Sequence, residues 1–200
     1  MKKVREKNEY EGNPVGLTKE TATAMAKELD RHLASFIVLY HQYHKHHWLV
    51  EGPQFRDLHL FFEEHYNEIH EQYDAIAERL TVMGYCPTCH PANQLKIAYL
   101  EHEEEGEFRI REMLNKDMDD EKTIAVELRK SIKKAFELED FATKSLLEGI
   151  LLKTEDRCHH IEHFLGEDSL SIGLVHLPGD ILEDGEAEES KSKSKKKAKA

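Results

Sequence analysis

Four long stretches of the chain repeat apolar residues at intervals of three and four, which is the period of an amphipathic α-helix. The first stretch begins after Thr18, a residue type that caps helix N-termini, and runs to about Leu49. Its inward positions are Met25, Leu29, Leu33, Phe36, Tyr40, Tyr43 and His47. The sequence VEGP at 50–53 interrupts the pattern, and Pro53 is well placed to start a second helix.

The second stretch predicts a helix of roughly thirty residues that ends before Gly84. Its inward positions are Phe55, Phe62, Tyr66, Ile69, Tyr73, Ile76, Leu80 and Met83. A long connection follows, in which the loop YCPTCHPAN (85–93) precedes a short helix expected near 94–103. The second and third long helices are therefore expected to be joined by a crossover.

The third and fourth stretches predict helices over about 108–138 and 141–165, the last closing at Gly166. No Gly or Pro separates them, so this boundary is the least defined by the sequence. No alternating strand pattern competes with the helical one. Four long helices with one long crossover between the second and third predict an all-α, ferritin-like four-helix bundle.

Composition agrees with a single helical domain. The 200 residues are 39% hydrophobic and 34% charged, with ten Gly and five Pro. No apolar run reaches the roughly 18 residues that span a bilayer, so no membrane association is expected. The N-terminal sequence MKKVREKNEYEGNP has no apolar segment typical of a secretory signal. We therefore expect a cytoplasmic protein whose three cysteines are reduced.

Charge separates the C-terminal segment from the rest. The net charge is −12, which argues against general nucleic-acid binding by the whole surface. Residues 178–190 hold six acidic residues and no basic one, and residues 191–200 hold six lysines and no acidic one. The lysines are Lys191, Lys193, Lys195, Lys196, Lys197 and Lys199. Without them, residues 1–190 carry −18 (−12 minus 6).

These blocks predict a flexible arm over 1–17, a folded domain over 18–175 and a disordered tail over 176–200. Two interpretations of the tail stay open. It either keeps the protein soluble or binds DNA or another polyanion through its lysines.

Carboxylates and a histidine share one face of the second helix. His59 and Glu63 are spaced i,i+4, as are Asp74 and Glu78, and all four lie within about 100° of one another. Positions 63 and 74 are about 16 Å apart along the axis, too far to hold one metal ion. The pairs 59/78 and 63/74 have the same sum, however. A two-fold axis near residues 68 and 69 would therefore bring His59 to Glu78 and Glu63 to Asp74 of a second copy.

His47 lies across the turn from His59 and is expected to add another ligand. Two imidazoles with three carboxylates form a nitrogen and oxygen donor set that suits iron better than a thiolate-rich structural zinc site. The alternative is that these residues form salt bridges and hydrogen bonds at an interface without any metal.

The segment HWLVEGPQFRDLHLFFEEHYNEIHEQYDAIAER (47–79) resembles the Dps family, the DNA-binding proteins from starved cells. The resemblance rests on the HW pair, the V-x-G-x-x-F turn, the LH-x-x-F step and the closing D-x-x-A-E-R, and extends over about 18–166. It implies a hollow homododecamer whose ferroxidase centres, at dimer interfaces, oxidise Fe(II) with hydrogen peroxide or oxygen. The ferric mineral is stored inside, which protects DNA.

Carried over by position, the resemblance implies that His47, His59 and Glu63 of one chain bind iron with Asp74 and Glu78 of a second copy. Glu63 stands where the family often has aspartate. Trp48 matches a family tryptophan beside the iron site, where it is either a redox-active neighbour or a large core aromatic.

Two other functions remain in view. The lysine tail is typical of a nucleoid-associated protein that compacts DNA, for which the iron site would be secondary. A ferritin with its metal sites inside each subunit needs Glu-x-x-His pairs on two helices, and the nearest match is the single Asp156-x-x-His159.

Several cysteines and histidines have no assigned role. The sequence CPTCH (86–90) matches a haem-attachment pattern, but also a metal site, a redox switch or a capped loop. Cys158 is followed by His159, His160 and His163 near the end of the fourth helix, which we interpret as a His-rich surface rather than a haem or metal site. A further set either lines auxiliary metal sites or faces solvent, and we expect solvent: His41, His44, His46, His65 and His70.

Overall fold

A computed structural model describes residues 2–166, which form five helices and no strand. They are α1 (Lys19–Leu49), α2 (Phe55–Val82), α3 (Pro91–Ile97), α4 (Ile110–Glu137) and α5 (Phe141–Leu165). The all-α prediction and the four long helices are confirmed. The short helix lies at 91–97 instead of 94–103, because Pro91 occupies its first turn. The expected boundary at 175 and the tail over 176–200 lie outside the described residues.

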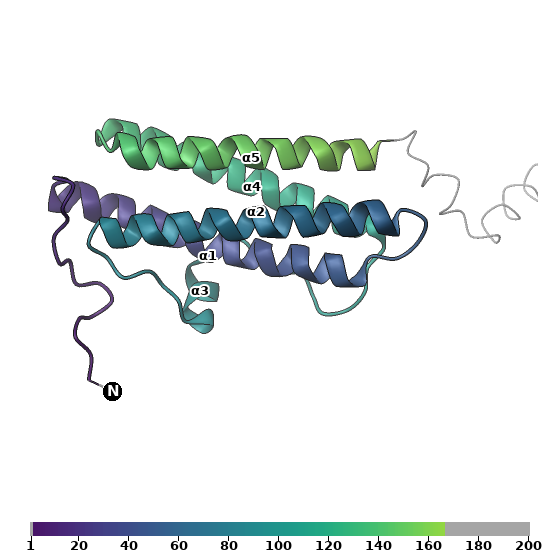
Figure 1. The fold of residues 1–200 in the computed structure, drawn as a ribbon, viewed down its shortest axis with the longest axis horizontal. Coiled ribbons are helices and arrows are strands. Elements are labelled where there is room, and N and C mark those ends of the chain that lie inside the picture. Colours follow the sequence, from purple (N-terminus) through teal and green to yellow (C-terminus); the bar gives the residue numbers. More distant parts are fainter. Residues whose placement is uncertain (1, 167–200) are drawn as a thin grey trace, which may run out of the picture. The chain divides into compact units, whose positions relative to one another are not determined.

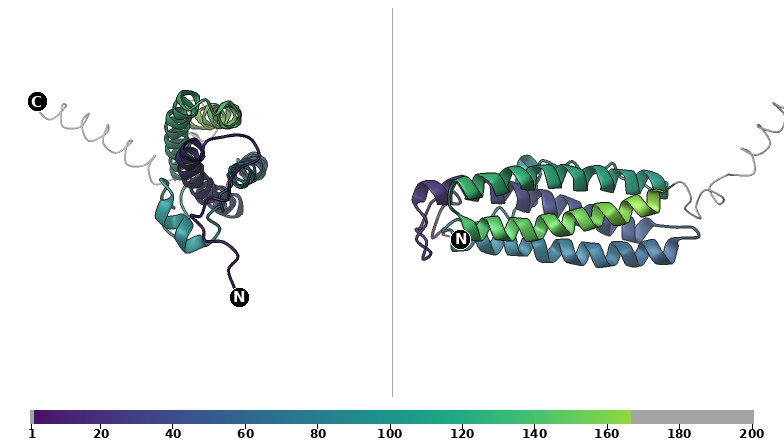
Figure 2. Two further views of the ribbon diagram at one scale, coloured as in Figure 1. Left: turned by 90° about the vertical axis from the view of Figure 1, so that its left-hand side faces the viewer. Right: turned by 90° about the horizontal axis from the view of Figure 1, so that it is seen from above.

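The four long helices lie side by side as two antiparallel pairs (Figures 1 and 2). Helix α1 packs along α2, α4 packs along α5, and α1 also contacts α4. The crossover runs from the end of α2 back along the bundle to the start of α4, so α2 and α4 point the same way (Figure 1). This is the ferritin-like topology with one long crossover. None of the helices in residues 2–166 has the length and apolar character needed to cross a membrane.

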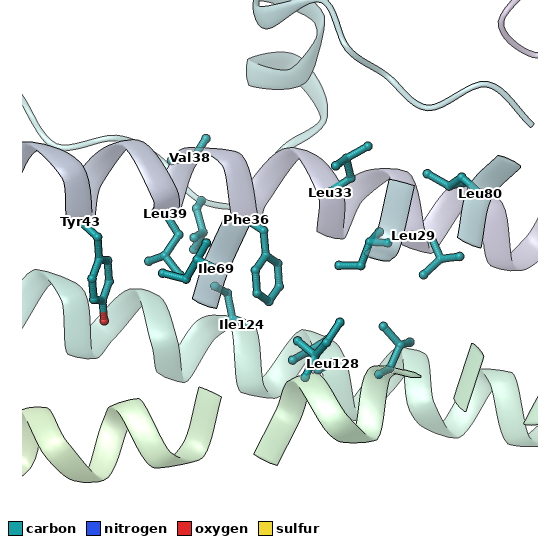
Figure 3. Packing of buried hydrophobic residues seen from close by; sticks show 14 of the residues in the cluster. Leu29, Leu33, Phe36, Val38, Leu39, Tyr43, Ile69, Leu80, Ile124 and Leu128 are labelled. Carbon is teal, nitrogen blue, oxygen red and sulfur yellow. The ribbon is translucent and has the colours of Figure 1, made fainter. Parts of the chain in front are cut away.

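The core is built from the apolar positions that the helical period predicts. Figure 3 shows Leu29, Phe36 and Leu39 of α1 facing Ile124 and Leu128 of α4. These side chains are fully buried, as are most of the predicted inward positions of α2. Tyr66 and Tyr73 are partly buried, and Phe55 is 46% exposed because it stands in the first turn of α2. Burial of apolar area at these positions is the main force that stabilises the bundle.

The turn between α4 and α5 contains no glycine. Glu139 takes a left-handed backbone conformation, with φ of 58°, which reverses the chain after α4. Asp140 then accepts a hydrogen bond from the Thr143 amide (3.1 Å) at the start of α5. The same carboxylate accepts a bond from Arg79 of α2 (2.8 Å). The boundary between α4 and α5 is therefore set by a left-handed residue and a capping aspartate, without Gly or Pro.

The crossover is fixed to α1 by buried hydrogen bonds. His32 bonds through Nδ1 to the Tyr99 hydroxyl (2.8 Å) and through Nε2 to the Ser131 hydroxyl of α4 (2.9 Å). The Tyr99 amide donates to the Ser35 hydroxyl (2.9 Å). One side of α1 therefore holds both the crossover and α4, and α3 of the crossover also packs on α1.

His32 should make the fold sensitive to acid. Burial lowers the pKa of His32 to about 4, although the nearby Glu28 opposes the shift. Since this value is below the usual 6.5, the folded state prefers the neutral ring, and its contribution is complete above pH 6.5 and lost as the pH falls. When the pH falls from 7 to 5, the free energy of unfolding should decrease in both proteins. We expect the decrease to be about 2 kcal/mol smaller in His32→Gln than in the wild type. Urea unfolding at one protein concentration measures this, and equal losses would contradict it.

Candidate metal centre

His47 and His59 are locked together where α1 and α2 meet. His47 Nδ1 lies 2.9 Å from the backbone carbonyl oxygen of His59, and His59 Nδ1 lies 2.9 Å from that of His47. The two rings are stacked with centroids 3.7 Å apart. The turn VEGP makes this reciprocal contact feasible because it brings the last turn of α1 beside the first turns of α2.

The reciprocal bonds define the chemistry of both rings. A carbonyl oxygen only accepts hydrogen bonds, so each Nδ1 must carry a proton and donate it. In neutral histidine the other nitrogen, Nε2, then has a free lone pair. A backbone acceptor on Nδ1 is also what orients metal-binding histidines and fixes their tautomer. The structure therefore presents two oriented nitrogen donors, both only half-buried.

The three carboxylates lie exposed along α2. Glu63 follows His59 by one turn, whereas Asp74 and Glu78 lie further along the same helix. They face away from the core, although the side of α2 that carries them also carries some of its apolar residues. Across residues 2–166, no group of three or more His, Cys, Asp or Glu side chains is gathered closely enough to hold a metal ion. The folded chain brings His47 and His59 together but leaves Asp74 and Glu78 apart from them.

Trp48 does not belong to the core of the subunit. It is 68% exposed and stacks on His44, with ring centroids 4.8 Å apart. His44 in turn packs against Tyr66 (4.1 Å), which contacts His47 (5.3 Å). The interpretation of Trp48 as a core aromatic of this chain is therefore wrong. Trp48 is instead linked to the histidines at 47 and 59 through a layer of aromatic rings on the surface.

The prediction that five other histidines face solvent is wrong for two of them. His41 and His70 are exposed and His44 is partly exposed, but His46 and His65 are buried. His46 lies only one residue before His47, and a rotation of about 100° per residue turns it toward α4 instead of outward. The sequence HKHH does not show which of its histidines is inside.

A buried polar network in the bundle interior was not predicted. His46 bonds through Nδ1 to Asp117 (2.8 Å) and through Nε2 to Glu103 (2.8 Å). Burial alone would lower the pKa of His46, but Asp117 and then Glu103 raise it above its usual value. Gln42 donates to Asp117 (2.9 Å) and to Asp120 (2.8 Å). Both ring nitrogens of His46 thus face carboxylate oxygens, so neither is available for a metal.

A second buried polar cluster contains an ion pair. Arg157 is fully buried and donates to Glu121 through Nε (2.6 Å) and Nη2 (3.1 Å). Tyr43 donates to the same carboxylate (2.9 Å), and Arg157 also reaches Glu68 (2.7 Å). Burial would lower the pKa of Arg157, but Glu121 raises it, so the guanidinium stays charged. The missed signal is that Asp117, Glu121 and Arg157 stand at inward positions of α4 and α5, where apolar residues are expected.

Comparisons with known proteins agree with this architecture. The model of the ferritin-like domain family matches residues 26–171. A nutrient stress-induced DNA-binding protein from a Synechococcus species is 42% identical over 165 residues, covering 82% of this chain and 94% of that protein. The crystal structure of an archaeal Dps homologue from Halobacterium salinarum has a TM-score of 0.82 at 35% identity, covering 90% of this chain and 98% of that one. The chain belongs to the Dps family.

The resemblance of residues 47–79 to Dps proteins is thus confirmed, and other members extend it. DpsC from Streptomyces coelicolor has a TM-score of 0.82 at 26% identity, covering 84% of this chain and 99% of that one. A Dps protein from Vibrio cholerae has a TM-score of 0.74 at 24% identity, covering 78% of this chain and 97% of that one. That protein is described as a member of a broad superfamily of ferritin-like diiron-carboxylate proteins. At this identity the likeness shows the shared fold.

Proposed function

We propose that this Dps protein oxidises Fe(II), with hydrogen peroxide or oxygen as oxidant, and stores the ferric product inside a hollow dodecamer. The observation that carries the proposal is the reciprocal bonding of His47 and His59, which leaves both Nε2 atoms free to bind metal. Glu63 is one helical turn from His59 and adds an oxygen donor. These three residues form half of an iron site.

The other half comes from a second copy of the chain. Asp74 and Glu78 are exposed and lie too far along α2 to reach the histidines of their own chain. Antiparallel pairing of two α2 helices about an axis near residues 68 and 69 would bring Asp74 opposite Glu63 and Glu78 opposite His59. An isologous dimer of this kind holds two identical sites.

The donor set suits the reaction. Anionic carboxylates stabilise Fe(III) more than Fe(II), because their attraction grows with the charge of the ion, so they favour oxidation. Two Fe(II) ions supply two electrons to one hydrogen peroxide, which takes up two protons and becomes two waters. This stoichiometry avoids release of hydroxyl radicals. The charge of −18 over residues 1–190 would attract Fe(II) to the shell.

Stopped-flow measurement of iron oxidation tests the site. Protein loaded anaerobically with Fe(II) and then mixed with peroxide should form the ferric product at least about tenfold more slowly when it carries His59→Ala with Asp74→Ala. His163→Ala, which removes an exposed histidine of α5, is the matched control and should match the wild type. Wild-type rates in the double variant would remove the assignment of these residues.

A second function, DNA binding, is favoured by the six lysines between 191 and 199. These lysines lie outside the described residues, so the proposal rests on the sequence and on the name of the Synechococcus relative as a DNA-binding protein. Phosphate contacts would supply the affinity, and twelve tails on one shell would add avidity. Nucleoid association in the cytoplasm would follow from it.

Gel shifts at low salt test the tail. Full-length protein should retard DNA, and protein truncated to residues 1–190 should not, because the six lysines are removed. Raising the salt concentration should abolish the shift. Equal migration of DNA with both proteins would exclude the tail as a binding element.

A further inference from the structure

Cys86, the first residue of CPTCH, is in direct contact with an arginine of the N-terminal arm. Arg5 Nη2 lies 3.1 Å from the Cys86 Sγ, and its Nη1 lies 3.3 Å from the carbonyl oxygen of Gly84. Arg5 also forms an ion pair with Glu11. Reactive cysteines in proteins are found beside cationic groups of this kind, because the thiolate is the nucleophile.

The arm and the loop hold each other in place. The Glu11 amide donates to the Gly84 carbonyl (3.3 Å), and the rings of Tyr10 and Tyr85 pack with centroids 5.5 Å apart. Gly84 has φ of 84°, and a Cβ there would lie 2.1 Å from the backbone oxygen of Gly12, so only glycine allows this approach. The contact between Arg5 and Cys86 is therefore part of a closely packed junction between the arm and residues 84–86.

Asp30 of α1 provides a second connection between the arm and the loop. Its carboxylate accepts bonds from the Thr88 amide (2.8 Å) and hydroxyl (2.6 Å). Lys7 of the arm forms an ion pair with the same carboxylate (2.7 Å). A chemical change at residues 86–89 would thus reach the arm at two points.

The sulfur is open to small reagents. Cys86 lines a cavity of about 590 Å³ between the arm, α1 and the start of the crossover, with Lys7 and Lys27 among the other lining residues. Cys89 is exposed, three residues further on. Cys158 is half-buried like Cys86, but burial raises its pKa to about 11, so its thiol stays protonated. The chain therefore contains both a candidate reactive thiol and an internal inert one.

A metal site at this loop is not supported. Cys86, Cys89 and His90 would have to converge on one ion, yet among residues 2–166 no three such side chains are placed to do so. This cavity is lined by Cys86 but not by Cys89, so it is not a site at which both cysteines could hold a haem.

We propose that Cys86 is a redox-sensitive thiol that hydroperoxides oxidise, and that Cys89 resolves the product to a disulfide which releases the N-terminal arm. The Cys86 thiolate attacks one peroxide oxygen, the O–O bond breaks, and water leaves after protonation, giving a sulfenic acid. The Cys89 thiol then displaces the hydroxyl as a second water, and the S–S bond forms. The peroxide gains the two electrons that the two sulfurs lose. In the disulfide, the Cys86 sulfur can no longer form a thiolate beside Arg5, so one of the contacts that hold the arm is lost.

The first test compares the three cysteines in the iron-free full-length protein. Timed alkylation with iodoacetamide at pH 7, read by peptide mass spectrometry, should label Cys86 faster than the more exposed Cys89, and at least about tenfold faster than Cys158. Arg5→Gln should slow Cys86 about tenfold. Lys3→Gln is the control, since Lys3 is an exposed cation of the same arm that forms an ion pair with Glu6 (2.8 Å). Labelling in order of exposure, unaffected by Arg5→Gln, would overturn the proposal.

The second test follows the product. Iron-free protein treated with hydrogen peroxide should lose two hydrogen atoms in the tryptic peptide that contains Cys86 and Cys89. Trypsin cleavage of the folded protein after Arg5 and Lys7 should accelerate about tenfold, and a thiol reductant should reverse it. In Cys89→Ser, Cys86 should stop at a sulfenic acid that dimedone traps. Oxidation that needs added Fe(II), or a disulfide that leaves arm cleavage unchanged, contradicts the proposal. Neither result bears on iron oxidation at His59, so the two proposals fail independently.

Discussion

Subunits that carry His59→Ala and subunits that carry Asp74→Ala are each expected to oxidise iron poorly, but to recover activity when co-assembled. In a mixed dimer, one site receives both substitutions and the other receives none, because each site takes His59 from one chain and Asp74 from the other. Random pairing of equal amounts leaves about a quarter of all sites intact. Oxidation of Fe(II) per subunit should therefore return to about a quarter of the wild-type rate.

The matched control combines two substitutions from the same half of the site. Subunits with His59→Ala co-assembled with subunits with Glu63→Ala should give no recovery. Each site takes both of these residues from the same chain, so every site in a mixed dimer lacks one of them. Co-expression with two affinity tags yields mixed assemblies for both pairs. Recovery in the control, or none in the test pair, would show that the site is not divided between chains as proposed.

Arg157→Ala is expected to destabilise the subunit by about 3–5 kcal/mol, because it leaves the Glu121 carboxylate buried without a counter-ion. Urea unfolding at a fixed protein concentration measures the change. Arg129→Ala is the matched control: Arg129 pairs with Glu155 on the surface (2.6 Å), and its loss should cost about 1 kcal/mol or less.

The double variant Arg157→Met with Glu121→Leu measures the net contribution of the ion pair to stability, separately from the cost of leaving one charge unpaired. Replacing both charges by apolar side chains of similar size removes the unpaired carboxylate, so most of the lost stability should return. The Tyr43 hydroxyl would still lose its acceptor, which should keep the double variant below the wild type. If Arg157→Ala unfolds at the wild-type urea concentration, Glu121 is not a buried charge that needs this partner.

The placement of the candidate residues along α2 could be predicted from the sequence. The spacings 59/63 and 74/78 lie within single helices, where 3.6 residues per turn fixes the relative directions of side chains. Their arrangement along α2 could therefore be calculated before any tertiary contact was known. The same holds for the turn at 50–53, since Gly and Pro act on the local backbone.

The sequence did not show which of two neighbouring histidines is buried. His46 and His47 are adjacent in the sequence HKHH, yet one is enclosed by Asp117 and Glu103 and the other stacks on His59. Their partners lie between 12 and 71 residues away in the chain. No local pattern contains this information, so the expectation that His46 faces solvent was wrong.

By itself the sequence determined the number of long helices, their approximate ends and the face of α2 that carries the carboxylates, because each of these follows from local backbone geometry and from apolar periodicity. Only the tertiary structure decided that the rings of His47 and His59 are locked as Nδ1 donors, that Arg157 and Glu121 pair inside the bundle, and that Arg5 contacts Cys86. The physical reason is common to all three. Each depends on groups that packing brings together from different segments, and the protonation or reactivity of a side chain is set by such neighbours rather than by its place in the chain.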